Sequence, residues 1–178
     1  MSTKLSPAPV PVTEAVPHTI SVLVANEPGI LARVVGLFSG RGYNIESLTV
    51  AETDAKKNQS RITIVTKGTP MVIEQIKAQL DRLVPVYRVR DLTVEGPHIE
   101  RELALVKVKS TGDKRGEALQ LAEVFRAKVI DAKANSFVFE VTGNSEKVAT
   151  FIGLMETLGL VDVARTGIVA MSRGGEAF

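Results

Sequence analysis

The chain has 178 residues, of which 44% are hydrophobic and 24% charged, enough apolar material for one medium domain or two small ones. It contains no Cys, which excludes disulfide scaffolds, thiolate metal sites and cysteine nucleophiles and favours a cytoplasmic setting. The 22 basic and 20 acidic residues leave a net charge of only +2, and no apolar run reaches the ~20 residues of a membrane span, so we expect neither nucleic-acid binding nor membrane insertion.

Residues 1–17 are rich in proline, with Pro7, Pro9, Pro11 and Pro17, and have neither an apolar signal-peptide core nor the Arg-rich pattern of a transit peptide. We expect a disordered tail here.

Hydrophobic periodicity then predicts a first unit in the order βαββαβ. The expected strands cover residues 18–25, 44–53, 60–67 and 86–94, with a hairpin loop at 54–58. The first expected helix follows the turn at Asn26–Gly29, and its apolar face carries Leu31, Val34, Val35 and Phe38. The second begins at Thr69-Pro70, and its apolar face carries Val72, Ile76, Leu80 and Leu83.

The same order recurs after Gly96-Pro97. The expected strands are 101–109, 128–133, 136–142 and 160–170, with a loop holding Gly112 and Gly116 before the third helix. The sequence therefore predicts an α+β protein with two ferredoxin-like sandwiches, each a four-stranded antiparallel sheet with two helices on one face. The expected domains are 18–95 and 98–174. Because each is small and leaves one sheet face open, we expect self-association.

Residues that could perform catalysis are few. His18 and His98 each start a unit, a repeated placement that favours a structural role. Glu100 and Glu102, on either side of Arg101, could pair as carboxylates but are expected to face solvent. There is no Walker A motif, dinucleotide-binding glycine motif or HExxH. We predict no catalytic residue and no metal site.

The turn from Asn26 to Leu31 is the most informative segment. It leads into a helix N-terminus, whose free N–H groups suit a carboxylate, and Gly29 allows a ligand to approach the backbone. The amide of Asn26 could serve both ends of a zwitterion. Alternatively, Asn26 or Glu27 simply caps the helix and Pro28 occupies its first turn.

The segment Tyr43-Asn44-Ile45 is expected to open the second strand, which is an edge strand in this topology. That edge could pair with the same strand of a second copy to form an eight-stranded sheet with two-fold symmetry. Asn44 and Ile45 would then complete a pocket begun by the partner's Asn26 turn. Taken singly, they could equally be a turn residue and a core residue.

Residues 26–39 (NEPGILARVVGLFS) and 41–50 (RGYNIESLTV) closely resemble the regulatory, or small, subunit of acetolactate synthase, also called acetohydroxyacid synthase. The first unit is similar to its ACT domain. The second is similar to the C-terminal domain of that family, notably at residues 100–103, 125–131 and 164–167. The resemblance covers about residues 18–174.

The resemblance implies that a separate catalytic subunit carries thiamine diphosphate, Mg²⁺ and FAD and condenses two pyruvates, or pyruvate with 2-oxobutyrate, in branched-chain amino-acid biosynthesis. It implies that the small subunit has no active site, raises activity and confers feedback inhibition, usually by valine bound between two ACT domains of a homodimer. The implied effector-binding residues are Asn26, Gly29, Ile30 and Leu31 from one chain and Asn44 and Ile45 from the other.

Two other functions stay open at this stage. An ACT-type sensor could use the same pocket to regulate a different enzyme or transcription. A small acyl-phosphate hydrolase of ferredoxin-like fold would instead pair Arg33 or Arg41 with Asn44. The preferred branched-chain amino acid and the stoichiometry with the catalytic subunit are left undecided, because one methylene changes binding by only about 1–3 kcal/mol. The tail and the loop 54–59 receive no role.

Overall fold

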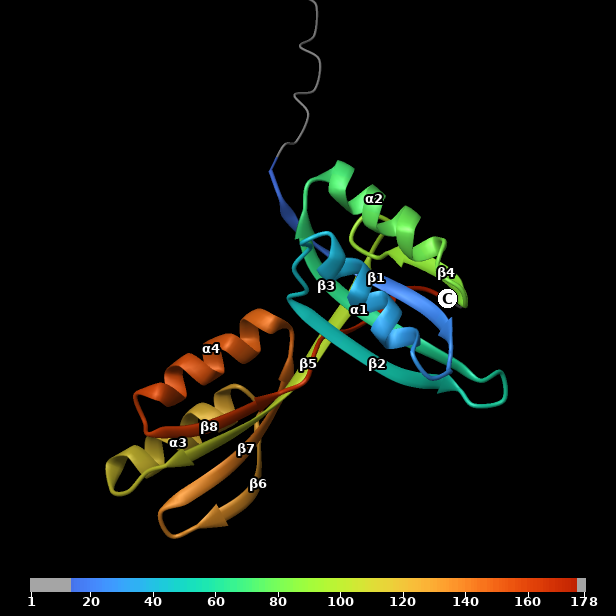
Figure 1. Cartoon of the computed structure of the whole chain (residues 1–178). Coiled ribbons are helices and arrows are strands. Elements are labelled where there is room, and N and C mark those ends of the chain that lie inside the picture. Colours follow the sequence, from blue (N-terminus) through green and yellow to red (C-terminus); the bar gives the residue numbers. More distant parts are fainter. Residues whose placement is uncertain (1–13, 176–178) are drawn as a thin grey trace, which may run out of the picture.

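The computed structural model describes residues 14–175 and contains two separate hydrophobic cores (Figure 1). The N-terminal domain consists of β1 (Val16–Ala25), α1 (Ile30–Gly40), β2 (Ser47–Asp54), β3 (Gln59–Gly68), α2 (Pro70–Asp81) and β4 (Val86–Asp91). The C-terminal domain consists of β5 (His98–Lys109), α3 (Asp113–Val124), β6 (Lys128–Lys133), β7 (Ser136–Gly143), α4 (Ser145–Glu156), β8 (Leu160–Arg165) and β9 (Val169–Ser172). The predicted α+β fold, with its order βαββαβ in each unit, is confirmed.

The first sheet has the strand order β2-β3-β1-β4 and is antiparallel throughout, so β2 is an edge strand. Alternate residues of β1 (Ile20, Val22 and Val24) point toward the helices and are fully buried. Phe38 of α1 and Ile76 of α2 pack in the same core, so both helices cover one face of the sheet.

The second sheet repeats this order as β6-β7-β5-β8. Phe139 of β7 and Phe151 of α4 meet edge to face at its centre, with ring centroids 6.1 Å apart. Ala118 and Ala122 of α3 bury only small side chains, which lets that helix lie close to the sheet.

Several boundaries differ from the predictions. β1 begins at Val16, inside the expected tail, while residues 1–13 lie outside the described residues. β2 begins at Ser47, so Tyr43-Asn44-Ile45 precede this strand rather than open it. Gly116 lies inside α3, and Gly112 occupies the position before that helix.

The expected strand 160–170 is two strands. β8 pairs with Ala104–Val108 of β5, whereas β9 pairs with His98–Arg101 at the other end of β5. Between these strands Thr166 is still bonded to β5, whereas Gly167 and Ile168 leave the second sheet and contact β2 of the first domain. The strand is interrupted because its middle is bonded to another domain, which local periodicity cannot show.

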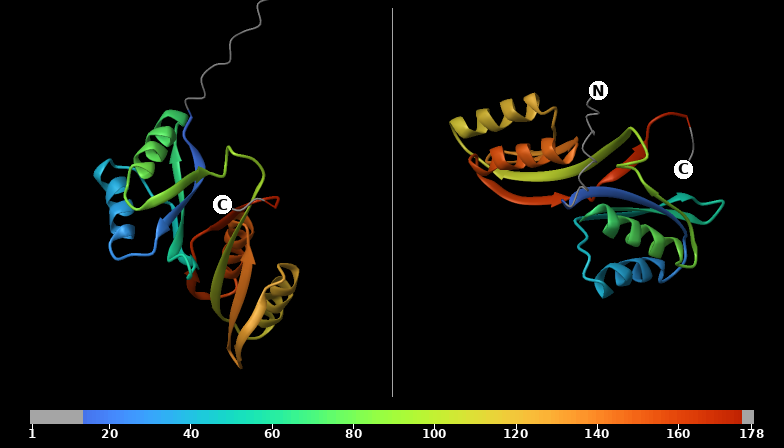
Figure 2. Two further views of the ribbon diagram at one scale, coloured as in Figure 1. Left: turned by 90° about the vertical axis from the view of Figure 1, so that its right-hand side faces the viewer. Right: turned by 90° about the horizontal axis from the view of Figure 1, so that it is seen from above.

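β5 and β9 form a two-stranded ribbon on the open face of the first sheet, opposite α1 and α2 (Figure 2). Glu100 and Ala170 pair across the ribbon on the side that faces this sheet, and Ala170 is buried. Thr19 and Ser21, on the open face of β1, are buried as well. The chain therefore covers part of this face itself.

The same face of the first sheet carries arginines. Burial, and then the neighbouring charge of Arg90, lower the pKa of Arg61.

Among residues 14–175, no helix combines the length and apolarity needed to cross a bilayer, and no group of three or more His, Asp or Glu side chains is placed to hold a metal.

Candidate functional site

Gly29 occupies the N-cap position of α1 in the left-handed conformation, with φ of 88°, and no side chain caps the helix. Asn26 and Glu27 therefore do not cap α1, and the backbone N–H of Asn26 instead donates to the Asn58 carbonyl over 2.8 Å. In the described part of the chain, the N–H groups of Leu31 and Ala32 have no hydrogen-bond acceptor. The capping interpretation is wrong, and these donors are left for another acceptor.

The surroundings of this helix end are open. Asn26 and Gly29 are exposed, and a Cβ added to Gly29 would meet no heavy atom within 4 Å. Leu31 is half-buried, whereas the side chain of Ile30 belongs to the first core and is only 5% exposed. Ile30 can therefore contribute only its backbone to a ligand.

Asn44 and Ile45 lie between α1 and β2. The Asn44 carbonyl accepts from Thr66 Oγ1 over 2.6 Å, which fixes the backbone, while the residue as a whole is exposed. Ile45 is half-buried and packs against the first core. This segment can therefore present an amide and an aliphatic edge from a fixed backbone.

One chain does not bring the two halves of the predicted site together. Asn26 is bonded to Asn58, and Asn44 is bonded to Thr66. Asn58 and Thr66 lie eight residues apart along an extended chain, which separates them by roughly 25 Å. The hydrolase alternative also lacks support at Arg33. This residue lies in the first turn of α1 and donates to the Val84 carbonyl over 2.6 Å, and the rest of α1, roughly 10 Å, separates its backbone from the Asn44 end.

The exposed edge of β2 offers a way to join the halves. In the described chain β2 pairs only with β3, so the other edge of β2 is available to a strand of another molecule. If two copies paired antiparallel along this edge, the start of one β2 would lie beside the end of the other. Asn44 and Ile45 of one chain would then approach the end of the partner's domain at which α1 begins.

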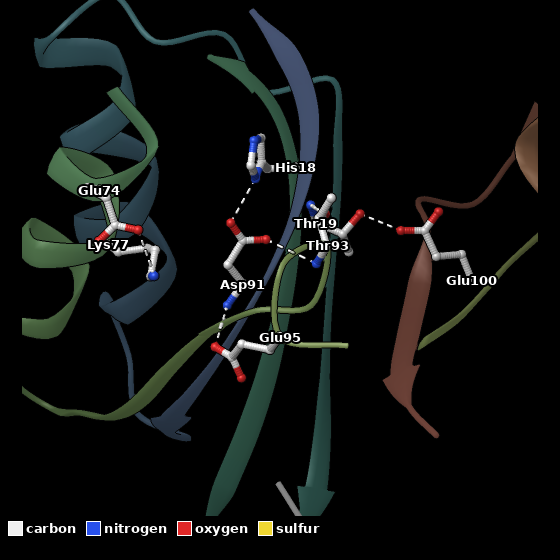
Figure 3. A network of polar contacts seen from close by, with 8 residues as sticks. All are labelled: His18, Thr19, Glu74, Lys77, Asp91, Thr93, Glu95 and Glu100. Atoms are coloured by element: carbon white, nitrogen blue, oxygen red, sulfur yellow. Dashed lines mark hydrogen bonds and ion pairs between the residues drawn. The ribbon is translucent and has the colours of Figure 1, made fainter. Parts of the chain in front are cut away.

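Two of the remaining titratable candidates, His18 and Glu100, belong to a network between the domains (Figure 3). His18 and Asp91 are both buried and bonded, with Nδ1 and Oδ2 2.7 Å apart. Asp91 Oδ1 accepts from the Thr93 N–H, Thr93 Oγ1 accepts from the Thr19 N–H, and the Thr19 hydroxyl donates to Glu100. These groups bond one another across the domain junction.

The expectation that Glu100 and Glu102 face solvent is wrong. Glu102 is 6% exposed and forms a charge-assisted hydrogen bond with Arg165, while Glu100 bonds Thr19 and lies 3.2 Å from His98 Nε2. No local pattern could have shown this, because Arg165 is 63 positions away along the chain.

Two cavities, of about 510 and 370 Å³, lie at the domain junction and share Glu46, Val65, Ser145 and Ile168 in their walls. None of the six predicted effector residues lines either of them. The junction and the predicted site are separate places on the molecule.

Comparison with known proteins gives a family for both domains. Residues 20–88 match the family described as the AHAS small subunit-like ACT domain, and residues 101–174 match the family described as the small subunit of acetolactate synthase. The chain is 48% identical over 159 residues to a probable acetolactate synthase small subunit of Archaeoglobus fulgidus, covering 89% of this chain and 98% of that protein.

Two further relatives agree. The isozyme 3 small subunit of Salmonella typhimurium is 47% identical over 156 residues, which is 87% of this chain and 94% of that one. A crystal structure of the acetolactate synthase small subunit from Thermotoga maritima superposes with a TM-score of 0.82 at 42% identity, covering 90% of this chain and 99% of the other. This chain belongs to the acetolactate synthase small-subunit family.

Proposed function

We propose that this protein is the cytoplasmic regulatory subunit of an acetolactate synthase in branched-chain amino-acid biosynthesis. It raises the activity of a separate catalytic subunit, which carries thiamine diphosphate, Mg²⁺ and FAD, and it makes that activity sensitive to valine. Membership of the small-subunit family supports the partner, and the ACT domain supports the amino-acid effector.

The effector site on this proposal is shared by two chains. Free N–H groups at the start of α1, next to Gly29, hold the carboxylate of valine, and Asn26 with the partner's Asn44 bonds its polar groups. Leu31 and the partner's Ile45 enclose the isopropyl group. A homodimer through β2 follows from this arrangement.

The observation that carries the proposal is the uncapped N-terminus of α1. A helix end without a side-chain cap, beside a glycine in the left-handed region, leaves N–H donors facing solvent in a free chain. α2 and α3 also begin without a side-chain cap, but α2 starts at Pro70, which has no N–H, and α3 has Asp113 in its first turn. α4 is capped by Asn144, and α1 has none of these three features.

Reconstitution tests the proposal directly. The purified chain is mixed with the catalytic subunit, and acetolactate formation is titrated with valine, leucine and isoleucine in turn. We expect activation on mixing and inhibition by at least one of the three, with valine the most effective. Activation without inhibition by any of them would contradict the effector assignment, whereas binding of valine without any effect on acetolactate synthase would favour a sensor for a different target.

A further inference from the structure

Ile168 is held on the first domain by both polar groups of its backbone. Its N–H donates to Ser47 Oγ over 2.7 Å, and its carbonyl accepts from Thr49 Oγ1. Ser47 and Thr49 are two apart on β2 and therefore point to the same face of the strand, the open face. Two β2 side chains thus bind a piece of backbone that belongs to the C-terminal domain.

Gly167 brings the same segment into contact with the backbone of β2. A Cβ at this position would lie 2.5 Å from the Leu48 carbonyl oxygen and 3.0 Å from Ser47 Oγ, so any other residue would push the segment away. The contact is close because position 167 has no side chain.

The preceding residues are bonded just as firmly to the second sheet. The Thr166 N–H donates to the Leu103 carbonyl over 2.9 Å, and the Leu103 N–H donates to Thr166 Oγ1 over 3.0 Å. Arg165 is bonded to the buried Glu102. Residues 165–168 therefore have one half on β5 and the other half on β2, with no free residue between the two attachments.

We propose that Ser47, Thr49, Gly167 and Ile168 are positioning residues that couple effector binding to the orientation of the C-terminal domain. The inference rests on the proposed function, in which Asn44 and Ile45 contact the effector. Ile45 is two residues from Ser47, so a shift of this segment on binding moves the start of β2 and, with it, the bonded Ile168. The Thr19–Glu100 bond holds the ribbon to β1, so movement at β2 turns the C-terminal domain instead of translating it.

Removing the two side-chain oxygens tests the coupling. The double variant Ser47→Ala/Thr49→Val keeps the size of both side chains nearly unchanged and removes both bonds to Ile168. Thr49→Ser keeps the hydroxyl and serves as the conservative variant, and Thr53→Val changes an exposed threonine of the same strand as the matched control. Thr49→Val alone carries the test if the double variant does not fold.

Two quantities are measured for each variant: the valine dissociation constant of the small subunit by calorimetry, and the inhibition at saturating valine after reconstitution. We expect the double variant to bind valine as the parent does but to lose about fivefold or more of the ratio between uninhibited and inhibited activity. Thr49→Ser and Thr53→Val should retain the parental ratio. Hydrogen exchange gives a readout without the catalytic subunit: valine should change exchange at residues 165–170 in the parent and not in the double variant.

The outcomes separate the two proposals. A double variant that binds valine and is inhibited like the parent overturns the coupling role and leaves the effector site intact. A parent that binds none of the branched-chain amino acids overturns the proposed function, and the coupling role with it.

Discussion

At the scale of single residues, Glu100 and Glu102 lie on the same face of β5 but have different partners. Glu100 reaches across to Thr19 of the first domain, whereas Glu102 is buried against Arg165 within its own domain. A carboxylate as buried as that of Glu102 is tolerated only with a cationic or hydrogen-bonding partner. The Arg165 pair therefore stabilises the fold mainly by satisfying a charge that the fold has already buried.

Replacing Arg165 with Met should accordingly destabilise the protein. It leaves the Glu102 carboxylate buried without its guanidinium, at a cost of about 1–3 kcal/mol. Thermal melting measures the loss. The double variant Glu102→Leu/Arg165→Met removes both charges and should melt at a higher temperature than Arg165→Met alone. A double variant that melts below the single one would show that the ion pair stabilises the fold by more than the burial of its charges costs.

The proposed carboxylate contact at Gly29 can be tested by adding charge without much size. Gly29→Asp places a negative group in open space beside the free N–H groups of α1, where it occupies the donors and repels a carboxylate. Gly29→Asn is the matched control, since Asn is nearly the same size and shares the tolerance of Asp for left-handed backbone. Calorimetry should show valine binding lost in the Asp variant and weakened less in the Asn variant. Equal binding by both would remove Gly29 from the site.

At the scale of elements, α1 and α4 have opposite beginnings. In α4 the Asn144 side chain accepts from the Lys147 N–H over 3.0 Å, and Glu146 lies in the first turn, where a negative charge is favourable. α1 has neither a capping side chain nor an acidic residue in its first turn. The end of α4 is satisfied within the chain, while that of α1 is stabilised only by solvent or a ligand.

Asn144→Ala should lower the free energy of unfolding by about 1 kcal/mol, because the Lys147 N–H loses its acceptor. Asn144→Asp retains an acceptor and should stay within a few tenths of a kcal/mol of the parent, as capping preferences for the two residues are similar. Urea unfolding followed by circular dichroism compares the three proteins. A loss of equal size in both variants would mean that the cap is not what Asn144 contributes.

At the scale of the whole molecule, each sheet has two edge strands, β2 and β4 in the first and β6 and β8 in the second, and the edges of β2 and β6 correspond to each other. Both edges carry exposed aliphatic residues, Val50 on β2 and Val129 on β6. Of β2 and β6, only β2 lies in the domain with the uncapped α1, so the proposed dimer uses the edge of β2 and leaves that of β6 free.

Val50→Lys tests that choice of edge. Val50 lies at the middle of β2, so in a two-fold antiparallel pair the new charge faces its own copy across the axis. We expect the dimer dissociation constant to rise about tenfold or more, measured by sedimentation equilibrium. Val129→Lys on β6 is the control and should leave the dimer unchanged. The reverse result would transfer the interface to the C-terminal domain.

The sequence predicts what local patterns determine. The expected strand 18–25 and the helical spacing of Val34 with Phe38 and of Ile76 with Leu80 identify elements whose core the structure confirms. What it does not predict depends on distant partners. The burial of Glu102 requires Arg165, and the break in the last strand requires Ser47 and Thr49, more than a hundred positions away.

The candidate site likewise has features that the sequence predicts and features that it does not. The open end of α1 could be inferred from the turn Asn26–Leu31, because Gly and Pro mark it in the sequence. Whether Asn26 caps the helix could not be inferred, because both interpretations fit the same residue pattern and the N-cap depends on backbone geometry. The φ of Gly29 in the structure distinguishes them. The role of Ile30 as a core residue follows from packing alone.

β5 connects the two ends of the molecule without a break. Its first four residues pair with β9 on the first domain, and its later residues form the centre of the second sheet. As a twelve-residue strand it is roughly 40 Å long, so a tilt of about 5° at the ribbon displaces its far end by about 3 Å. This strand therefore amplifies movement. A displacement too small to disturb the packing of the first domain becomes, at the far tip of the second domain, as large as the donor–acceptor distance of a hydrogen bond.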